Sequence, residues 1–306
     1  MAEYSAISWC DATFNPWIGC TRVSRACAHC YAERWAARFG RVAWDGPPAR
    51  TSAANWRQPL AWNTSAVRSG RGLCVFCASL GDVFDNAVPA AWRADLWALI
   101  EATPVLTWML LTKRIGNAQR MFPVAWLDRP RPNVWRGATV VNQEEADRDV
   151  PKLIATPAAL RFVSCEPLLA PIEFDHEWLE AERFGHADDC DDDLCALNAD
   201  EHSCAEQVYP QPSINWVIVG GESGPDARPV HPEWVRSIRD QCIEASVPFH
   251  FKQWGEWAPN CLCGTRSAHQ TTKRPEPGKM GVMFRCGRRG AARELDGRVW
   301  AEFPVP

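Results

Sequence analysis

Three cysteines near the N-terminus have the residue type and spacing of a metal site. Six residues separate Cys20 from Cys27, and Cys30 completes a Cys-x-x-Cys pair. Three thiolates are one ligand short of a closed tetrahedral zinc site. They can also hold three corners of a [4Fe-4S] cluster and leave the fourth iron open to another ligand. The spacing therefore predicts an iron–sulfur cluster, with zinc or plain structural thiols as the alternatives.

Further cysteines suggest a second metal site, of zinc or a second cluster. The candidate ligands lie in an acidic segment and in the C-terminal tail: Cys190, Cys195, Cys204, Cys261, Cys263 and Cys286, with His186, His202 and His269 nearby. An acidic segment with few apolar residues cannot form a core, so a bound metal would explain how it folds. The alternative is that these thiols are reduced and bind nothing.

Cys74 and Cys77 also have Cys-x-x-Cys spacing, but they lie in a short apolar run typical of a buried strand. Successive side chains of a strand point to opposite faces, so these two thiols should not converge. We expect both of them, and Cys242 on an amphipathic helix, to be small core residues.

The elements that must position the first three cysteines alternate in type. A helix is expected at 31–39, followed by an irregular connection through residue 63. Strand-like runs then alternate with helical patterns: 73–80 and 89–102, 105–112 and 115–122, 133–140 and 144–155, 161–165, 214–220 and 232–245, and 248–252. This order predicts an α/β fold with a parallel sheet, as a full or partial (β/α) barrel. An open doubly wound sheet is the alternative.

Polar residues follow the predicted strands where a parallel barrel has its active site. Gly220 and Gly221 would let a ligand approach the backbone, and Glu222 would offer a carboxylate to an amine or a ribose hydroxyl. Asn142 follows another strand and is a further candidate for cofactor binding. The alternative for Gly220–Glu222 is a tight turn with a solvated carboxylate.

Glu166 and Lys252 are the candidate catalytic residues. Glu166 could anchor a substrate or transfer a proton, or instead form a salt bridge with Lys113 or Arg114 across the barrel mouth. Lys252 could bind an anion, with Trp254 stacking on a flat ring. Because the chain has 17 tryptophans, most of which must be core residues, Trp254 could equally be one of these.

Several motifs together resemble those of a phage- and prophage-borne family of radical-SAM-like proteins of largely unassigned function. The segments are Asn-Pro-Trp-Ile-Gly-Cys at 15–20 with Cys-Tyr-Ala-Glu at 30–33, Leu-Thr-Lys-Arg at 111–114, Phe-Val-Ser-Cys-Glu-Pro-Leu-Leu at 162–169, Trp-Val-Ile-Val-Gly-Gly-Glu-Ser-Gly at 216–224 and Phe-Lys-Gln-Trp-Gly at 251–255. The resemblance covers about residues 7–175 and 214–258. The first cysteine gap is longer than in typical radical SAM loops and similar to that of this family.

The resemblance implies a (β/α) barrel of the radical SAM type that carries a [4Fe-4S] cluster on its first loop. It also implies S-adenosylmethionine as a ligand of the open iron, and a reducing partner such as flavodoxin or ferredoxin. In radical SAM proteins a Gly-Gly-Glu motif contacts the amino group of this cofactor, although it usually follows an earlier strand than Gly220–Glu222 does here.

Charge and composition divide the chain into four expected parts. Residues 1–174 and 214–258 form the barrel, 175–213 an acidic insertion, and 259–306 a basic, cysteine-containing extension. Residues 175–204 hold eleven of the 37 acidic residues, so the net charge of −4 hides a more basic remainder. The chain has neither a membrane-length apolar run nor a signal peptide, and its many cysteines suit a reducing compartment, so we expect a cytoplasmic protein.

These observations favour an iron–sulfur enzyme of the radical-SAM-like class that modifies or repairs a nucleic acid or nucleotide. One alternative is a metal-stabilised protein that binds nucleic acid or a host factor without catalysis. Another is an iron–sulfur DNA repair enzyme that does not use S-adenosylmethionine. The sequence does not specify the substrate.

Overall fold

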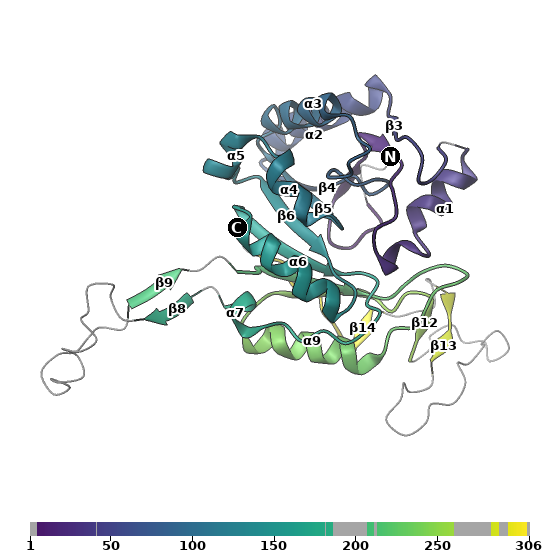
Figure 1. Ribbon diagram of the computed structural model, residues 1–306, viewed down its shortest axis with the longest axis vertical. Helices are drawn as coiled ribbons and strands as arrows, with labels where there is room; N and C mark the ends of the chain where they lie inside the picture. The colour runs from purple at the N-terminus through teal and green to yellow at the C-terminus, as the bar shows by residue number, and fades with distance from the viewer. Residues whose placement is uncertain are drawn as a thin grey trace, which may run out of the picture.

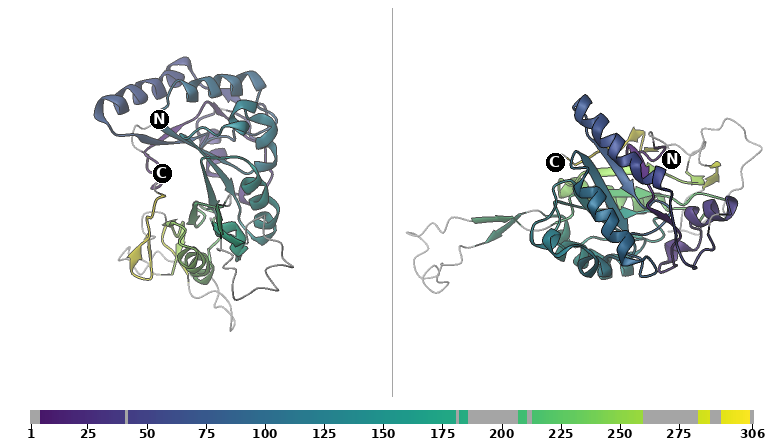
Figure 2. Two further views of the ribbon diagram at one scale, coloured as in Figure 1. Left: turned by 90° about the vertical axis from the view of Figure 1, so that its left-hand side faces the viewer. Right: turned by 90° about the horizontal axis from the view of Figure 1, so that it is seen from above.

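A curled sheet of seven parallel strands forms the centre of the protein (Figures 1 and 2). The computed structural model describes residues 5–40, 42–180, 182–185, 207–210, 213–259, 283–287 and 293–304. In spatial order the strands are β1 (Ala12–Phe14), β4 (Leu73–Cys77), β5 (Leu106–Thr112), β6 (Val134–Thr139), β7 (Leu160–Cys165), β10 (Trp216–Gly220) and β11 (Phe249–Gln253). Spatial order follows chain order, as in a (β/α) barrel, and the sheet curls without a pairing between its described end strands β1 and β11, so it is a half-barrel (Figure 2). The predicted partial α/β barrel is confirmed at this level.

Helices cover the outer face of the half-barrel (Figure 2). They are α2 (Ala53–Ser69), α3 (Ala90–Glu101), α4 (Ile115–Met121), α5 (Val124–Asp128), α6 (Gln143–Ala155), α7 (His176–Leu179) and α9 (Pro232–Glu244). Helix α1 (Tyr31–Arg38) and the short 3-10 helix η1 (Arg25–Cys27) before it belong to the segment that carries the first three cysteines. Most of the helices lie within one or two residues of the ranges expected from the sequence.

Helix α2 corrects one expectation, because the sequence predicted an irregular connection through residue 63. Ser52 caps the helix by accepting a hydrogen bond from the backbone N–H of Asn55. Pro59 lies inside the helix and costs it a backbone hydrogen bond, yet its side chain is buried, as are those of Trp62 and Ala66. Burial of this face outweighs the poor helix propensity of proline.

The two faces of the sheet bury separate apolar clusters. Strand β4 separates its cysteines as alternation requires: Cys77 is buried in the cluster on the helix side, and Cys74 packs against the cluster on the inner face. Gly137 on β6 leaves room for the ring of Phe162 on β7, because a Cβ there would lie 2.4 Å from that ring. The expectation that Cys74 and Cys77 are core residues is confirmed for Cys77, whereas Cys74 is half-buried at the edge of the inner cluster.

Short antiparallel pairs of strands lie outside the seven-stranded sheet. They are β2 (Trp17–Ile18) with β3 (Ala49–Arg50), β8 (Glu182–Gly185) with β9 (Gln207–Pro210), β12 (Trp257–Ala258) with β13 (Phe284–Arg285), and β14 (Glu294–Leu295) with β15 (Arg298–Val299). Strands β8 and β9 extend away from the half-barrel (Figure 1). No helix in these described ranges is long and apolar enough to cross a bilayer.

Candidate functional site

A cavity of about 570 Å³ lies at the carboxyl ends of the strands. Strand ends contribute Asp82 after β4, Thr112 and Lys113 at β5, Thr139 at β6, Ser164 and Glu166 at β7, Gly221 and Glu222 after β10, and Lys252 and Gln253 at β11. Cys20, Cys27 and Cys30 line the same cavity. The fold therefore brings the three spaced cysteines and the polar strand ends around one space.

The residues between Cys20 and Cys27 are anchored to the body of the protein. Thr21 donates to Asp85 Oδ2 from its backbone N at 2.8 Å and from its hydroxyl at 3.0 Å. The Arg22 guanidinium pairs with Asp45 and Glu33. The segment between Cys20 and Cys27, called the arch below, is thus held in place by these hydrogen bonds and ion pairs.

Ser24 anchors the end of this arch. Its hydroxyl accepts a hydrogen bond from Ala26 N at 3.0 Å, which caps η1, and donates to Glu145 Oε1 at 2.6 Å. Helix η1 ends at Cys27, and Cys30 is the N-cap residue of α1. The second and third cysteines are therefore placed by two short helical elements.

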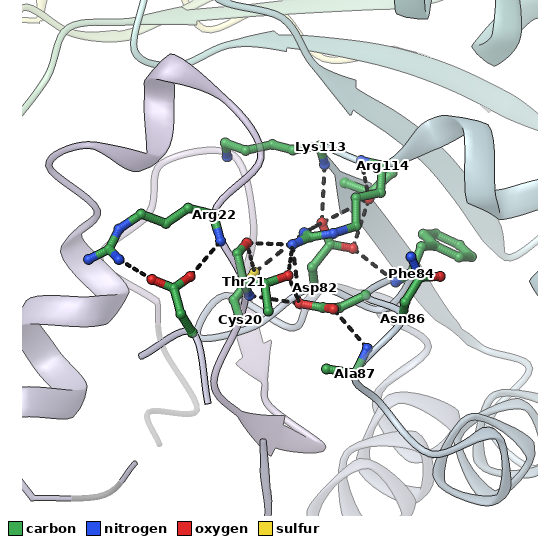
Figure 3. A network of polar contacts seen from close by, with 12 residues as sticks. Cys20, Thr21, Arg22, Asp82, Phe84, Asn86, Ala87, Lys113 and Arg114 are labelled. Carbon is green, nitrogen blue, oxygen red and sulfur yellow. Dashed lines mark hydrogen bonds and ion pairs between the residues drawn. The ribbon is translucent and has the colours of Figure 1, made fainter. Parts of the chain in front are cut away.

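Arg114 holds the Cys20 end of the loop (Figure 3). Its Nη1 lies 3.4 Å from Cys20 Sγ and 3.0 Å from Asp82 Oδ2, and its Nη2 lies 3.1 Å from Asp85 Oδ2. Burial, together with the Asp82 carboxylate, raises the pKa of the Cys20 thiol to about 12, while Arg114 works in the opposite direction. A metal bound here would have to displace the thiol proton.

Glu222 holds the Cys-x-x-Cys end. Its carboxylate accepts hydrogen bonds from Arg228 through the backbone N at 2.8 Å, Nε at 2.9 Å and Nη2 at 2.6 Å, and lies 3.1 Å from His29 Nδ1. Burial opposes ionisation, yet the bonds from Arg228 and His29 lower the pKa of Glu222. In this structure the two carboxylate oxygens are occupied by Arg228 and His29, so Glu222 stabilises the loop that carries Cys27 and Cys30.

The two glycines of the expected ligand-binding turn are required by the protein's own packing. A Cβ on Gly221 would lie 1.9 Å from the carbonyl oxygen of Trp254, and one on Gly220 would lie 2.5 Å from Glu166 Oε1. Gly221 lines the cavity. The two glycines therefore let neighbouring strand ends pack closely: Gly220 against Glu166, and Gly221 against the backbone of Trp254.

Glu166 and Lys252 form an ion pair, with Oε1 and Nζ 3.0 Å apart. The second carboxylate oxygen of Glu166 accepts from Trp9 Nε1 at 3.2 Å and lies 3.3 Å from the Ser164 hydroxyl. The alternative predicted from the sequence, a salt bridge of Glu166 with Lys113 or Arg114, is therefore wrong. Arg114 instead pairs with Asp82 and Asp85.

Three other expected residues lie elsewhere. Asn142 caps α6 by accepting from Glu145 N at 2.9 Å. Trp254 is buried, packs edge-on against Phe251 and donates to Glu294 O at 2.9 Å, so it is a core residue. Cys286 lies beside β13, where its Sγ is 3.4 Å from Phe284 O. The other candidates for a second metal site, namely His186, Cys190, Cys195, His202, Cys204, Cys261, Cys263 and His269, lie outside the described residues.

Sequence reasoning did not single out Asp82, Asp85 and Arg114 as site residues. Asp82 and Arg114 follow predicted strands, and Arg114 also ends the Leu-Thr-Lys-Arg segment at 111–114. Asp85 lies five residues beyond the end of the strand-like run at 73–80 and carried no signal of this kind. Its importance depends on contacts with Thr21 and Arg114, which are distant in the chain.

The donor set suits a cubane cluster. None of Cys20, Cys27 and Cys30 is in a disulfide, and all three face one cavity. Within the part of the chain that the structure describes, no three His, Cys, Asp or Glu side chains group closely enough to hold a single metal ion. A [4Fe-4S] cluster distributes its cysteines over separate irons, so its ligands surround a space and need not converge on one point. Three thiols around one space are sufficient for such a cluster, and they are one ligand short of a tetrahedral zinc site.

Comparisons with known proteins give a family and one structural likeness. A variant of spore photoproduct lyase with bound AdoMet and dinucleoside spore photoproduct aligns with 91% of this chain and 69% of its own, at 10% identity and a TM-score of 0.39. At that score the likeness carries no argument. No match was found among curated protein sequences. The model of a family described as "Protein of unknown function (DUF5131)" matches residues 4–304, and the chain therefore belongs to the DUF5131 family.

Proposed function

We propose that this protein is an iron–sulfur enzyme of the radical-SAM-like class, in which Cys20, Cys27 and Cys30 hold a [4Fe-4S] cluster with one open iron. The observation that carries the proposal is that these three thiols line one cavity at the carboxyl end of a parallel half-barrel. When bound, the cluster would supply the one-electron chemistry that cleaves S-adenosylmethionine reductively. A donor such as flavodoxin or ferredoxin would provide the electron.

The cavity wall supplies binding groups for a polar substrate. The Glu166–Lys252 pair offers an acceptor and a cation side by side. The buried hydroxyl of Thr139 has no hydrogen-bond partner among the residues that the structure describes, and it lies on the strand beside Ser164. These groups would orient a substrate, while the apolar side chains of Trp9 and Phe76 exclude water.

A nucleic acid or nucleotide is the substrate class that we propose. Four cations line the cavity, of which Arg114 and Lys252 pair with carboxylates. Within the described ranges, Lys113 and Arg293 have no carboxylate partner, so both are available to a phosphate group.

Incubation of the reconstituted, reduced protein with S-adenosylmethionine tests the proposed reaction. We expect 5′-deoxyadenosine from the wild type and none from the triple variant Cys20→Ala, Cys27→Ala, Cys30→Ala. Cys74→Ala is the matched control, because Cys74 lies on β4 outside the cavity lining. A cluster-bearing wild type that leaves S-adenosylmethionine intact would instead favour a repair enzyme that does not use this cofactor. Salt-dependent nucleic-acid binding without any cluster would favour a binding protein.

A further inference from the structure

Cys20 differs from the other two cavity cysteines in having a buried cation beside its sulfur. Arg114 Nη1 lies 3.4 Å from Cys20 Sγ, and the Arg114 side chain is only 7% exposed. Among the described residues, the sulfurs of Cys27 and Cys30 have no side chain hydrogen-bonded to them. One corner of the proposed site is therefore electrostatically distinct.

The guanidinium is fixed so that it keeps facing the thiol. Asp82 contacts Nη1 at 3.0 Å and Asp85 contacts Nη2 at 3.1 Å, with both carboxylates almost completely buried. The carbonyl oxygen of Thr21, the residue after Cys20, accepts from Nη2. Figure 3 shows the guanidinium beside Asp82, Thr21 and the sulfur of Cys20.

The hydroxyl of Thr112, two residues before Arg114, fixes the backbone from which the arginine side chain extends. Thr112 donates its hydroxyl to both oxygens of Asp82, at 2.8 and 2.9 Å, and accepts from Arg114 N at 2.8 Å. Thr112 thus links the backbone of Arg114 to the carboxylate of Asp82. A planar guanidinium whose N–H groups are bound on several sides keeps its orientation better than the ammonium group of a lysine would.

A hydrogen-bond donor or cation at a ligand sulfur raises the reduction potential of an iron–sulfur cluster, since reduction adds negative charge. A nearby carboxylate has the opposite effect. Arg114 contributes one positive charge at the sulfur, whereas Asp82 and Asp85 together contribute two negative charges behind it. The reduction potential of the cluster would depend on the balance between these charges.

We propose that Arg114 is a positioning residue that holds Cys20 and raises the reduction potential of the cluster, and that Asp82 counteracts it. This inference rests on the function proposed above. In the step concerned, one electron passes from a low-potential donor to the cluster, and no covalent bond forms or breaks. The donor in the experiment is dithionite.

The test is a redox titration of reconstituted protein, monitored by electron paramagnetic resonance. At the wild-type midpoint we expect the ratio of reduced to oxidised cluster to fall about tenfold in Arg114→Gln, which corresponds to about 59 mV for a one-electron couple. Arg114→Lys keeps the charge but loses the fork, so its ratio should fall less. Asp82→Asn should raise the ratio.

Lys113→Gln is the matched control, because Lys113 lines the same cavity and its side chain makes no hydrogen bond to Cys20. Its ratio should change less than that of Arg114→Gln. Circular dichroism and iron content establish that each variant folds and retains its cluster. Should Arg114→Gln fail to fold, the opposite shifts expected of Arg114→Lys and Asp82→Asn carry the test.

Opposite shifts for the Arg114 and Asp82 variants would support the inference. Unchanged midpoints, or shifts in the same direction, would overturn it while leaving the proposed function intact. A wild type without any cubane signal would overturn the proposed function and this inference together.

Discussion

The two ends of the cysteine loop are held by ion pairs of opposite polarity. At the Cys20 end a cation, Arg114, faces the loop and is held from behind by Asp82 and Asp85. At the other end a carboxylate, Glu222, faces His29 and is held by Arg228. One set of partners comes from the β4 and β5 ends and the other from the loop after β10. The half-barrel therefore contacts and positions the cysteine loop from two separate sides.

This difference explains how a loop with little regular structure can place three thiols around one cavity. The arch between Cys20 and Cys27 has its own anchors in Asp85 and Glu145. Buried ion pairs contribute little net stability, but removal of one partner is costly because a charge is left buried. The two ends should respond differently to such removals, because Arg114 is far less exposed than Arg228.

The largest effect should come from Arg114→Met, which leaves the Asp82 and Asp85 carboxylates buried without a cation. We expect the free energy of unfolding to fall by about 3–5 kcal/mol, measured by urea denaturation at pH 7. Arg131→Met is the control, since Arg131 pairs with Glu101 at the surface; its loss should be about 0–1 kcal/mol. Equal losses in the two variants would show that Arg114 is not a buried anchor.

Glu222→Gln should have a smaller effect at the opposite end. The amide keeps part of the hydrogen bonding, and Arg228, whose side chain is 34% exposed, can recover water. A loss of about 1–3 kcal/mol is expected by the same measurement. Glu233→Gln, at an exposed carboxylate on α9, should change little. A loss from Glu222→Gln larger than that from Arg114→Met would reverse the comparison.

Ser24→Ala tests the arch between the ends. It removes the cap of η1 and the hydrogen bond to Glu145. The expected loss is about 1 kcal/mol in the free energy of unfolding. Ser65→Ala, on the exposed face of α2, serves as the control and should show no loss. If the two substitutions behave alike, the arch is not held through Ser24.

Acid should weaken the Cys20 end through Asp85. Although burial acts in the other direction, hydrogen bonds from Ala87 and Thr21 and the charge of Arg114 lower the pKa of Asp85. Its contribution to stability is therefore fully present above the unfolded-state value of about 3.9 and is lost as pH falls through the lower folded-state value.

The stability difference between wild type and Asp85→Asn should accordingly shrink as the pH falls below about 4, as followed by urea denaturation. This is the smallest effect that we predict. Asp95→Asn, at an exposed carboxylate on α3, controls for general acid sensitivity. A difference that grows on acidification would have the wrong sign.

The sequence was sufficient for features that depend on local pattern. Alternating apolar runs indicated the parallel sheet, and the period of two on β4 separated Cys74 from Cys77. Asn142 also carried a local signal, because Glu145 follows it by three residues, as in a capping box. Read in that way, Asn142 would have been predicted as the cap of α6, which it is.

Features that depend on which strand ends meet could not be predicted in the same way. Glu166 pairs with Lys252, which is 86 positions further along the chain, because β7, β10 and β11 are neighbours in the sheet. Only the strand order and the curl of the sheet determine which cation reaches that carboxylate. Helix α2 is another such case, since Pro59 is tolerated there only through burial against the core.

Metal and acid-labile sulfide analysis of the anaerobically purified protein, with its electron paramagnetic resonance spectrum after reduction, tests the central claim most directly. We predict about four irons per chain and a cubane signal that disappears in the triple variant Cys20→Ala, Cys27→Ala, Cys30→Ala. More than four irons would indicate a second cluster in addition. Zinc without iron, or a signal that persists in the triple variant, would contradict the account.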